Sequence, residues 1–169
     1  MIRNVLFVCT GNSARSVLSE ATLNAWAPSR FLAFSAGSMP TGQINPFAIR
    51  QLQSEGIAVD GLRSKSCDEF SAGLAPAMDL VITVCDSAAA ETCPVFFGSC
   101  MRSHWGLPDP ASATGSDADK SAAFARAHAT IKLRLHALLA LPDELWTQPD
   151  ALKSALDQVG QLDVASNHG

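Results

Sequence analysis

Short apolar runs alternate along this chain with segments whose apolar residues recur at helical spacing. The run Val5–Val8 favours a β-strand, and the segment Ser16–Trp26 has the apolar spacing of a helix with one buried face. A second strand is predicted over Arg30–Ser35. A second helix is predicted after Asn45-Pro46, because asparagine is a favoured cap and proline is favoured in the first turn.

The rest of the chain continues this alternation. Asp79–Val84 is apolar almost throughout, which is typical of a strand covered on both faces in a parallel sheet. A short strand is predicted around 103–105, followed by a loop rich in Pro, Gly and Asp. A long helix is predicted from about Asp117 to Leu141, and a short one over 149–159. The pattern predicts an α/β fold, a three-layer domain in which helices flank a mostly parallel, four-stranded sheet.

Length, charge and cysteine content narrow the class of protein. The 169 residues suffice for one core, so residues 1–141 are predicted to form the domain, with 142–169 as a short helix and tail that packs on it or trails it. The formal charge of −4 argues against nucleic-acid and membrane partners. No secretory signal or membrane span is recognised, so a cytoplasmic protein is expected. Five widely spaced cysteines are then catalytic, redox-active or buried, and none has the spacing of a metal site.

The polar loop after the first strand has the composition of an anion site. The residues expected to bind the oxyanion are Thr10, Gly11, Asn12, Ser13, Ala14, Arg15 and Ser16. A loop between a strand and a helix can turn backbone N–H groups inward, and the helix N-terminus adds positive potential. The same potential predicts a lowered pKa for the Cys9 thiol, which would make it a nucleophile. The alternative is an ordinary buried cysteine beside a surface arginine.

The sequence VCTGNSARS (8–16) resembles the signature loop of the low-molecular-weight protein tyrosine phosphatases and of the arsenate reductases that share their fold. The segments that resemble the arsenate reductase branch are FSAG (34–37), NPFAI (45–49), VITVCD (81–86), CP (93–94) and HWGLPDP (104–110). The resemblance implies a phosphatase-like fold over roughly 1–140, with Cys9 as nucleophile, Arg15 as oxyanion ligand and Asp109 as general acid. It also implies that Asn12 and Ser35 hold the loop in shape.

The other cysteines distinguish a reductase from a phosphatase. Water releases the adduct of a phosphatase, whereas a reductase needs thiols that deliver two electrons. The resemblance implies that Cys85 attacks the Cys9 adduct and Cys93 then attacks Cys85, so that arsenate is reduced to arsenite for arsenic detoxification. The chain contains no tyrosine, and tyrosines line the cleft of the related phosphatases. A low-molecular-weight tyrosine phosphatase and a catalytically silent oxyanion-binding module remain the alternatives.

The partners of such a reductase follow from the same resemblance. Arsenate is the expected substrate, and phosphate or sulfate is expected to fit the same loop. No bound cofactor is expected; an external thiol reductant would supply electrons, with a thioredoxin-like protein favoured over glutathione and glutaredoxin. The gap between Cys85 and Cys93 is one residue longer than in the thioredoxin-coupled relatives, which keeps both donors open. Lys65 stands near the place of an acidic potassium ligand in some relatives, and no metal is assigned.

Overall fold

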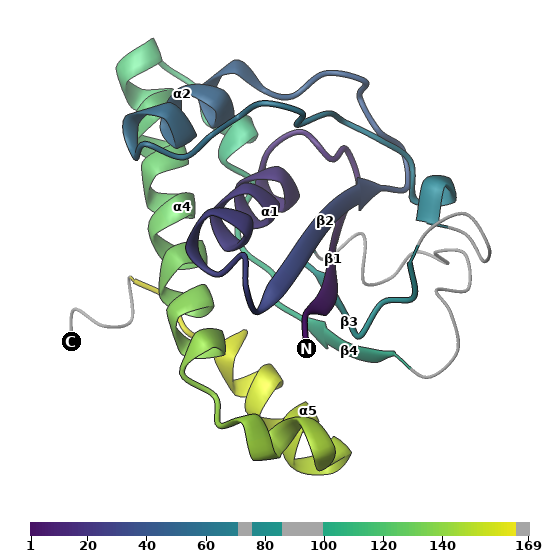
Figure 1. Cartoon of the computed structure of the whole chain (residues 1–169). Coiled ribbons are helices and arrows are strands. Elements are labelled where there is room, and N and C mark those ends of the chain that lie inside the picture. The colour runs from purple at the N-terminus through teal and green to yellow at the C-terminus, as the bar shows by residue number, and fades with distance from the viewer. Residues whose placement is uncertain (71–75, 86–99, 165–169) are drawn as a thin grey trace.

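Four parallel strands form a sheet in the order β2-β1-β3-β4 (Figure 1). The strands are β1 (Arg3–Cys9), β2 (Phe31–Gly37), β3 (Leu80–Thr83) and β4 (Met101–His104). The computed structural model describes residues 1–70, 76–85 and 100–164. The predicted α/β fold with a four-stranded parallel sheet is confirmed, although β4 begins earlier than expected because Met101 already pairs with Leu80.

The predicted helices are present with small differences at their ends. They are α1 (Arg15–Trp26), α2 (Pro46–Ser54), α4 (Asp117–Leu139) and α5 (Pro149–Val159), and short 3₁₀ turns lie at 67–70, 110–112 and 143–147. The Asn45 side chain accepts from the backbone N–H of Phe47, as expected of a cap. Ser116 and Asp119 form a capping box at the start of α4. That helix ends at Leu139, two residues before the predicted end. None of the helices in the described ranges is long and apolar enough to cross a membrane.

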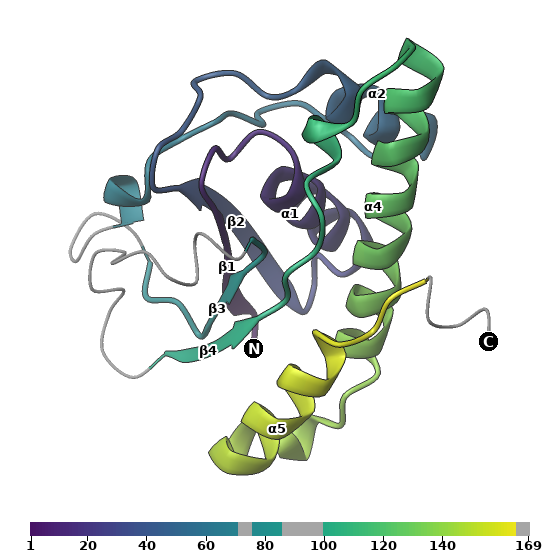
Figure 2. The same cartoon turned by 180° about the vertical axis from the view of Figure 1, so that it is seen from behind.

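The two faces of the sheet are covered differently. Helices α1 and α4 pack on one face, and α2 packs against both of them (Figures 1 and 2). In β2, the Ser35 hydroxyl donates to Glu20 of α1 at 3.2 Å, while the neighbouring Phe34 packs edge-on against Phe70 at 5.6 Å. Because successive side chains of a strand point to opposite faces, Phe70 packs on the second face of the sheet, at its edge strand β2.

The carboxyl ends of three strands meet at one edge of the sheet. Cys9 ends β1, Cys85 follows β3, and the loop that carries Asp109 follows β4. Strand β3 pairs directly with β1, so the two cysteines leave neighbouring strands in the same direction. Parallel sheets place their ligand sites at this edge, and the three chemical groups predicted from the sequence converge there.

The C-terminal segment packs along the edge strand of the sheet. The Trp105 indole N–H donates to the Leu156 carbonyl in α5 at 2.9 Å, and the Ser103 hydroxyl donates to Asp157 at 2.8 Å. Figure 2 shows α5 below β4, with the last described residues returning along α4. The described part of the segment after residue 141 therefore packs against the edge of the sheet.

A buried histidine joins the three helices of one face. His128 of α4 is fully buried, with Nε2 at 2.8 Å from Thr22 Oγ1 of α1 and Nδ1 at 3.0 Å from Gln51 Nε2 of α2. An amide nitrogen only donates, so Nδ1 accepts and the ring proton lies on Nε2. Burial, and then the charge of Lys132, lower the pKa of His128 to about 4. The ring is therefore a neutral link in the core.

Because His128 is buried in its neutral form, the protein should lose stability in mild acid. The unfolded chain binds a proton at His128 near pH 6.5, whereas the folded protein does so only near pH 4. The contribution of His128 to the free energy of unfolding is therefore fully present above pH 6.5 and is lost as the pH drops towards 4. The loss between pH 7 and pH 5 is about 2 kcal/mol. Urea unfolding across this range measures the slope. A His128→Gln variant should lose this part of the slope, and the exposed His136→Gln should keep it; equal slopes in all three proteins would contradict the assignment.

Candidate active site

The loop between β1 and α1 turns its carbonyl groups outward and ties them to a neighbouring segment. The backbone N–H groups of Ser38, Met39, Thr41 and Asn45 donate to the carbonyls of Cys9, Thr10, Gly11 and Ser13 at 2.9–3.3 Å. A loop whose carbonyls are held outside can present its N–H groups on the inside as an anion nest. Ala14 caps α1 without a side-chain hydrogen bond, so the first turn of the helix adds its own N–H groups.

Asn12 fixes the shape of this loop from within. It is the one non-glycine residue with a positive φ, 47°, in the part of the chain that the structure describes, as expected for a nest. Its Nδ2 donates to Ser16 Oγ at 2.8 Å, and its Oδ1 accepts from the backbone N–H of Lys65 at 2.9 Å. Gly37 allows the next strand to approach, because a Cβ there would lie 2.3 Å from the Thr10 carbonyl oxygen.

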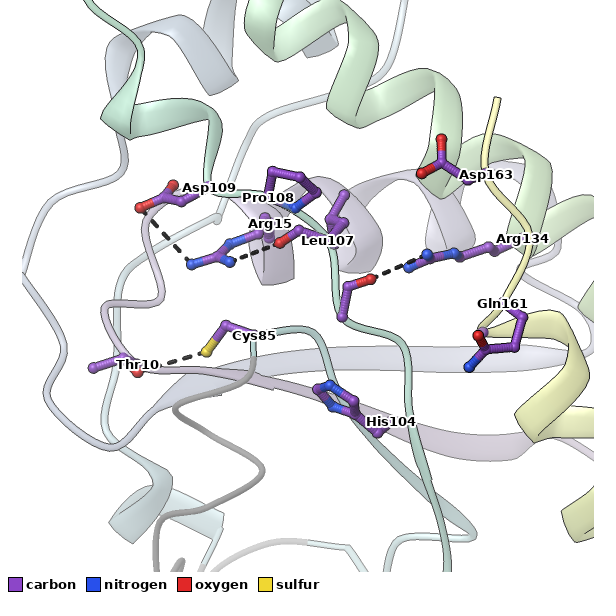
Figure 3. Close-up of a pocket in the computed structure, with 12 residues that line it drawn as sticks. Thr10, Arg15, Cys85, His104, Leu107, Pro108, Asp109, Arg134, Gln161 and Asp163 are labelled. Carbon is purple, nitrogen blue, oxygen red and sulfur yellow. Dashed lines mark hydrogen bonds and ion pairs between the residues drawn. The ribbon is translucent and has the colours of Figure 1, made fainter. Parts of the chain in front are cut away.

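Arg15 lies beside the loop, and its Nε–H group makes no hydrogen bond to the described residues. Its Nη1 donates to the Leu107 carbonyl at 2.9 Å, and its Nη2 lies 3.8 Å from Asp109 Oδ2 (Figure 3). Its Nε is buried and has no hydrogen-bond partner among the described residues. An unsatisfied buried N–H is costly unless a ligand accepts from it. The guanidinium is therefore positioned to bind a further oxygen.

Cys9 and Cys85 form a buried pair of thiols behind the loop. A hydrogen bond with Cys85 and burial raise the pKa of the Cys9 thiol, while the Arg15 charge and the Thr10 backbone N–H act in the opposite direction. The prediction of a lowered pKa for Cys9 is therefore wrong for this arrangement. The charge of Arg15 is evident from the sequence, whereas the contact with a second thiol is not. Thr10 Oγ1 lies 3.5 Å from Cys85 Sγ, so the loop touches both sulfurs.

Asp109 is held at the start of a short turn. Its Oδ1 accepts from the Ala111 backbone N–H at 3.0 Å, and its carbonyl accepts from the Ser112 hydroxyl at 2.7 Å. The side chain is 44% exposed and faces Arg15. The turn thus gives the carboxyl a fixed place beside the loop while leaving it accessible to a ligand and to solvent.

A buried ion pair supports the loop from behind. Lys65 Nζ lies 3.4 Å from Glu20 Oε1, and both side chains are about nine-tenths buried. The ammonium also donates to the Arg63 carbonyl at 3.2 Å. Burial raises the pKa of Glu20, and the charge of Lys65 opposes that shift. The Ser35 hydroxyl donates to the same carboxylate, so Ser35 is connected to the loop through Glu20 and Lys65.

Removal of the ammonium should destabilise the protein. Lys65→Met leaves the Glu20 carboxyl buried without its cation, and breaking a buried pair in this way costs about 3 kcal/mol or more. Denaturant unfolding at neutral pH measures the loss, and Glu20→Gln added to Lys65→Met should recover part of it. Lys153→Met serves as the control, because its pair with Asp157 is half exposed and should contribute less than about 1 kcal/mol. Equal losses in the two methionine variants would contradict this view.

The structure brings together most of the residues predicted for the site. Arg15, Cys85 and Asp109 line one cavity beside the loop, and Cys9 contacts Cys85, whereas Cys93 lies outside the described residues. Nothing in the composition of residues 38–45 marks their backbone N–H groups as the donors that hold the loop carbonyls, so this contact is not predictable from the sequence. Within residues 1–70, 76–85 and 100–164, no three His, Cys, Asp or Glu side chains gather as a metal site.

The comparisons with known proteins agree with this geometry. The family model described as low molecular weight phosphotyrosine protein phosphatase matches residues 4–150. An arsenate reductase of Halalkalibacterium halodurans is 35% identical over 131 residues, 78% of this chain and 91% of that protein.

Two solved structures share the fold. The arsenate reductase of Archaeoglobus fulgidus is 30% identical, with a TM-score of 0.63 over 81% of this chain and 99% of that one. An arsenate reductase in the phosphate binding state is 25% identical, with a TM-score of 0.66 over 82% and 97% of the two chains. The chain therefore belongs to the low molecular weight phosphotyrosine protein phosphatase family, in which its relatives include the arsenate reductases.

Proposed function

We propose that this chain reduces arsenate to arsenite through a covalent adduct on Cys9. The observation that carries the proposal is the thiol of Cys85 in hydrogen-bond contact with Cys9 beside the anion loop. A phosphatase uses water as its second reactant and has no need of a thiol there, whereas a reductase must receive electrons from one. Relatives named arsenate reductase, at 35% and 34% identity, support the same reading.

The first step forms the adduct. Arsenate is held by the loop N–H groups and by Arg15, whose buried Nε has an unused proton; a relative in a phosphate binding state supports a tetrahedral oxyanion here. The Cys9 thiol gives its proton to an oxygen of the bound arsenate, and the Arg15 charge and the Thr10 N–H stabilise the resulting thiolate. The Cys9 thiolate attacks arsenic, and Asp109 protonates the departing oxygen, which leaves as water.

The second step transfers the electrons. The Cys85 thiol loses its proton to solvent and its sulfur attacks Cys9 Sγ; the S–As bond breaks, and its electron pair stays on arsenic, which leaves as arsenite. A Cys9–Cys85 disulfide remains. Cys93 then attacks Cys85, freeing Cys9 and forming a Cys85–Cys93 disulfide. An external thiol reductant then reduces the Cys85–Cys93 disulfide. The donor is either a thioredoxin-like protein or glutathione with glutaredoxin, and both donors are expected in a reducing cytoplasm.

Arsenite production by the purified chain tests this proposal. Arsenate is supplied with thioredoxin and its reductase, or with glutathione and glutaredoxin, and arsenite is measured for wild type, Cys93→Ser and the control Cys100→Ser. Turnover with thioredoxin that is lost only in Cys93→Ser would support the complete relay. Equal turnover in wild type and Cys93→Ser would support arsenate reduction but show that Cys93 takes no part in it. No arsenite with either donor would overturn the proposal.

The same protein can be tested as a phosphatase. The segment after Asp109-Pro110 is Ala111-Ser112-Ala113, and the chain has no tyrosine to grip an aromatic ring. Hydrolysis of p-nitrophenyl phosphate at rates well above arsenate turnover, unchanged by Cys85→Ser, would favour the phosphatase instead. Tight arsenate binding with neither reaction would indicate a binding module.

A further inference from the structure

Arg134 is a buried arginine of α4 whose side chain binds three main-chain carbonyls. Only 4% of the residue is exposed. Its Nη1 donates to the Trp105 carbonyl at 2.7 Å, its Nη2 to the Gly106 carbonyl at 3.1 Å and its Nε to the Leu162 carbonyl at 2.9 Å. A guanidinium keeps its charge in proteins, and burying a charge is costly unless hydrogen bonds replace those made with water. Because all three nitrogens are occupied, this arginine holds the chain itself and not a ligand.

The three carbonyls belong to two segments that are distant in sequence. Two of them begin the loop that leads from β4 to Asp109, and the third belongs to the segment 160–164, which follows α5. Figure 3 shows the Arg134 side chain between the loop at Leu107 and the segment at Gln161. The family model matches the chain only as far as residue 150. Arg134 therefore joins the site to a part of the chain beyond that match.

Gly160 lets the segment 160–164 approach the end of β4 closely. A Cβ there would lie 2.5 Å from the Trp105 ring and 2.7 Å from the His104 carbonyl oxygen. The backbone of Gly160 has right-handed helical dihedrals, φ −65° and ψ −12°, which alanine also adopts. The close approach, and not the backbone conformation, therefore requires glycine. Gly160 also lines the cavity that Arg15 and Cys85 line, so the segment 160–164 belongs to the wall of the site.

The loop that Arg134 holds supports both charged groups of the site. Leu107 directly follows Gly106, and its carbonyl accepts from Arg15 Nη1 at 2.9 Å. Asp109 comes two residues later, with Oδ2 at 3.8 Å from Arg15 Nη2. Pro108 has a fixed φ, so the loop has little freedom to absorb a rotation at Gly106 before it reaches Asp109. A misplacement of about 1 Å at a reacting group can slow a reaction about a hundredfold.

We propose that the segment 160–164 acts through Arg134 to position Arg15 and Asp109 for the reaction. Arg134 is a positioning residue, because its donors are taken by carbonyls and it acts only through the loop that it holds. The proposal rests on the function proposed above, in which Arg15 binds arsenate and Asp109 protonates the departing oxygen. Both roles then depend on a segment that lies beyond the residues matched by the family model.

Phosphate binding to the whole chain tests the placement of Arg15 without any turnover. Gly160→Ala adds one methyl group, which forces the segment 160–164 away from Trp105. The affinity for phosphate, measured by calorimetry, should then fall about tenfold, as expected when one charge-assisted hydrogen bond is lost. Gln158→Ala is the control, since Gln158 is an exposed residue of α5 and should leave the affinity unchanged. Equal affinities in wild type and in Gly160→Ala shown to be folded by circular dichroism would overturn the proposal.

A second variant disturbs the same contact from α4. Arg134→Lys keeps the buried charge, but one ammonium nitrogen replaces the three guanidinium nitrogens that bind the carbonyls in a fixed geometry. The affinity for phosphate should fall about tenfold here too. Where Gly160→Ala does not fold, this variant decides, and wild-type affinity in folded Arg134→Lys would overturn the proposal.

A double-mutant cycle tests the placement of Asp109. At saturating arsenate, Gly160→Ala should lower kcat for arsenite production about a hundredfold in the wild-type background. In an Asp109→Asn background it should lower kcat less than about tenfold, because the displaced group has already lost the proton that it gives to the departing oxygen. A general loss of packing would lower kcat by the same factor in both backgrounds, and that result would overturn the positioning of Asp109.

The two measurements also separate this proposal from the function on which it rests. Weaker phosphate binding in Gly160→Ala, together with a wild type that makes no arsenite, would uphold the positioning of Arg15 and overturn arsenate reduction. Arsenite production by the wild type with unchanged phosphate binding in Gly160→Ala and Arg134→Lys would do the reverse.

Discussion

Replacing Cys9 with serine is expected to abolish arsenite production, by at least about ten-thousandfold, because a serine hydroxyl cannot form the adduct or the later disulfide. The protein should still bind the oxyanion. The loop and Arg15 are held by contacts that do not involve the Cys9 side chain: the backbone N–H groups of residues 38–45, the Asn12 side chain and the Leu107 carbonyl. Loss of turnover with retained binding would separate the nucleophile from the anion site.

Two measurements check this expectation. Arsenite is quantified under saturating thiol reductant, and phosphate or arsenate binding is followed by calorimetry at the same pH. Cys100→Ser is the matched control, since Cys100 is a half-buried cysteine distant in sequence from the loop and should leave both quantities unchanged. Arsenite production above about one percent of wild type in Cys9→Ser would show that another thiol attacks arsenate.

Much of the fold could be predicted because its signals are local. The apolar run of β1, the spacing of α1 and the Asn45 cap each depend on neighbouring residues, and each lies within a residue or two of its predicted place. The convergence of Cys9, Cys85 and Asp109 could also be predicted, because parallel strands bring their carboxyl ends to one edge.

The features that could not be predicted are contacts between distant parts of the chain. Lys65 and Glu20 are 45 residues apart, and neither has a local pattern that marks it as half of a buried pair. Arg134 stands in α4, where an arginine is usually a solvated residue, yet it holds the carbonyls of the loop before Asp109. The pKa of Cys9 was misjudged for the same reason, since its direction depends on a thiol 76 residues away.

Replacing Cys85 with serine should change two properties of Cys9 in opposite directions. Arsenite production is expected to fall at least about a thousandfold, because the adduct then has no neighbouring thiol to attack Cys9 Sγ. Alkylation of Cys9 by iodoacetamide at neutral pH should become faster. The hydrogen bond with Cys85 is the largest cause that raises the pKa of Cys9; without that thiol, the Arg15 charge and the Thr10 N–H oppose burial alone, and a serine hydroxyl can donate to the Cys9 thiolate.

The pH dependence of alkylation measures the shift in the pKa of Cys9. Hydrolysis of p-nitrophenyl phosphate measures whether Cys9 can still act as a nucleophile in the loop. A lower apparent pKa for Cys9 with lost arsenite production would assign to Cys85 both the resting protonation of the nucleophile and the delivery of electrons. Cys67→Ser is the control, since Cys67 is also buried but lies in the 3₁₀ turn between α2 and β3. Unchanged alkylation in Cys85→Ser would refute the thiol contact as the cause of the raised pKa, while unchanged arsenite production would refute the relay. The two roles can therefore fail separately, because one depends on a hydrogen bond in the reduced protein and the other on a bond formed after arsenate has reacted.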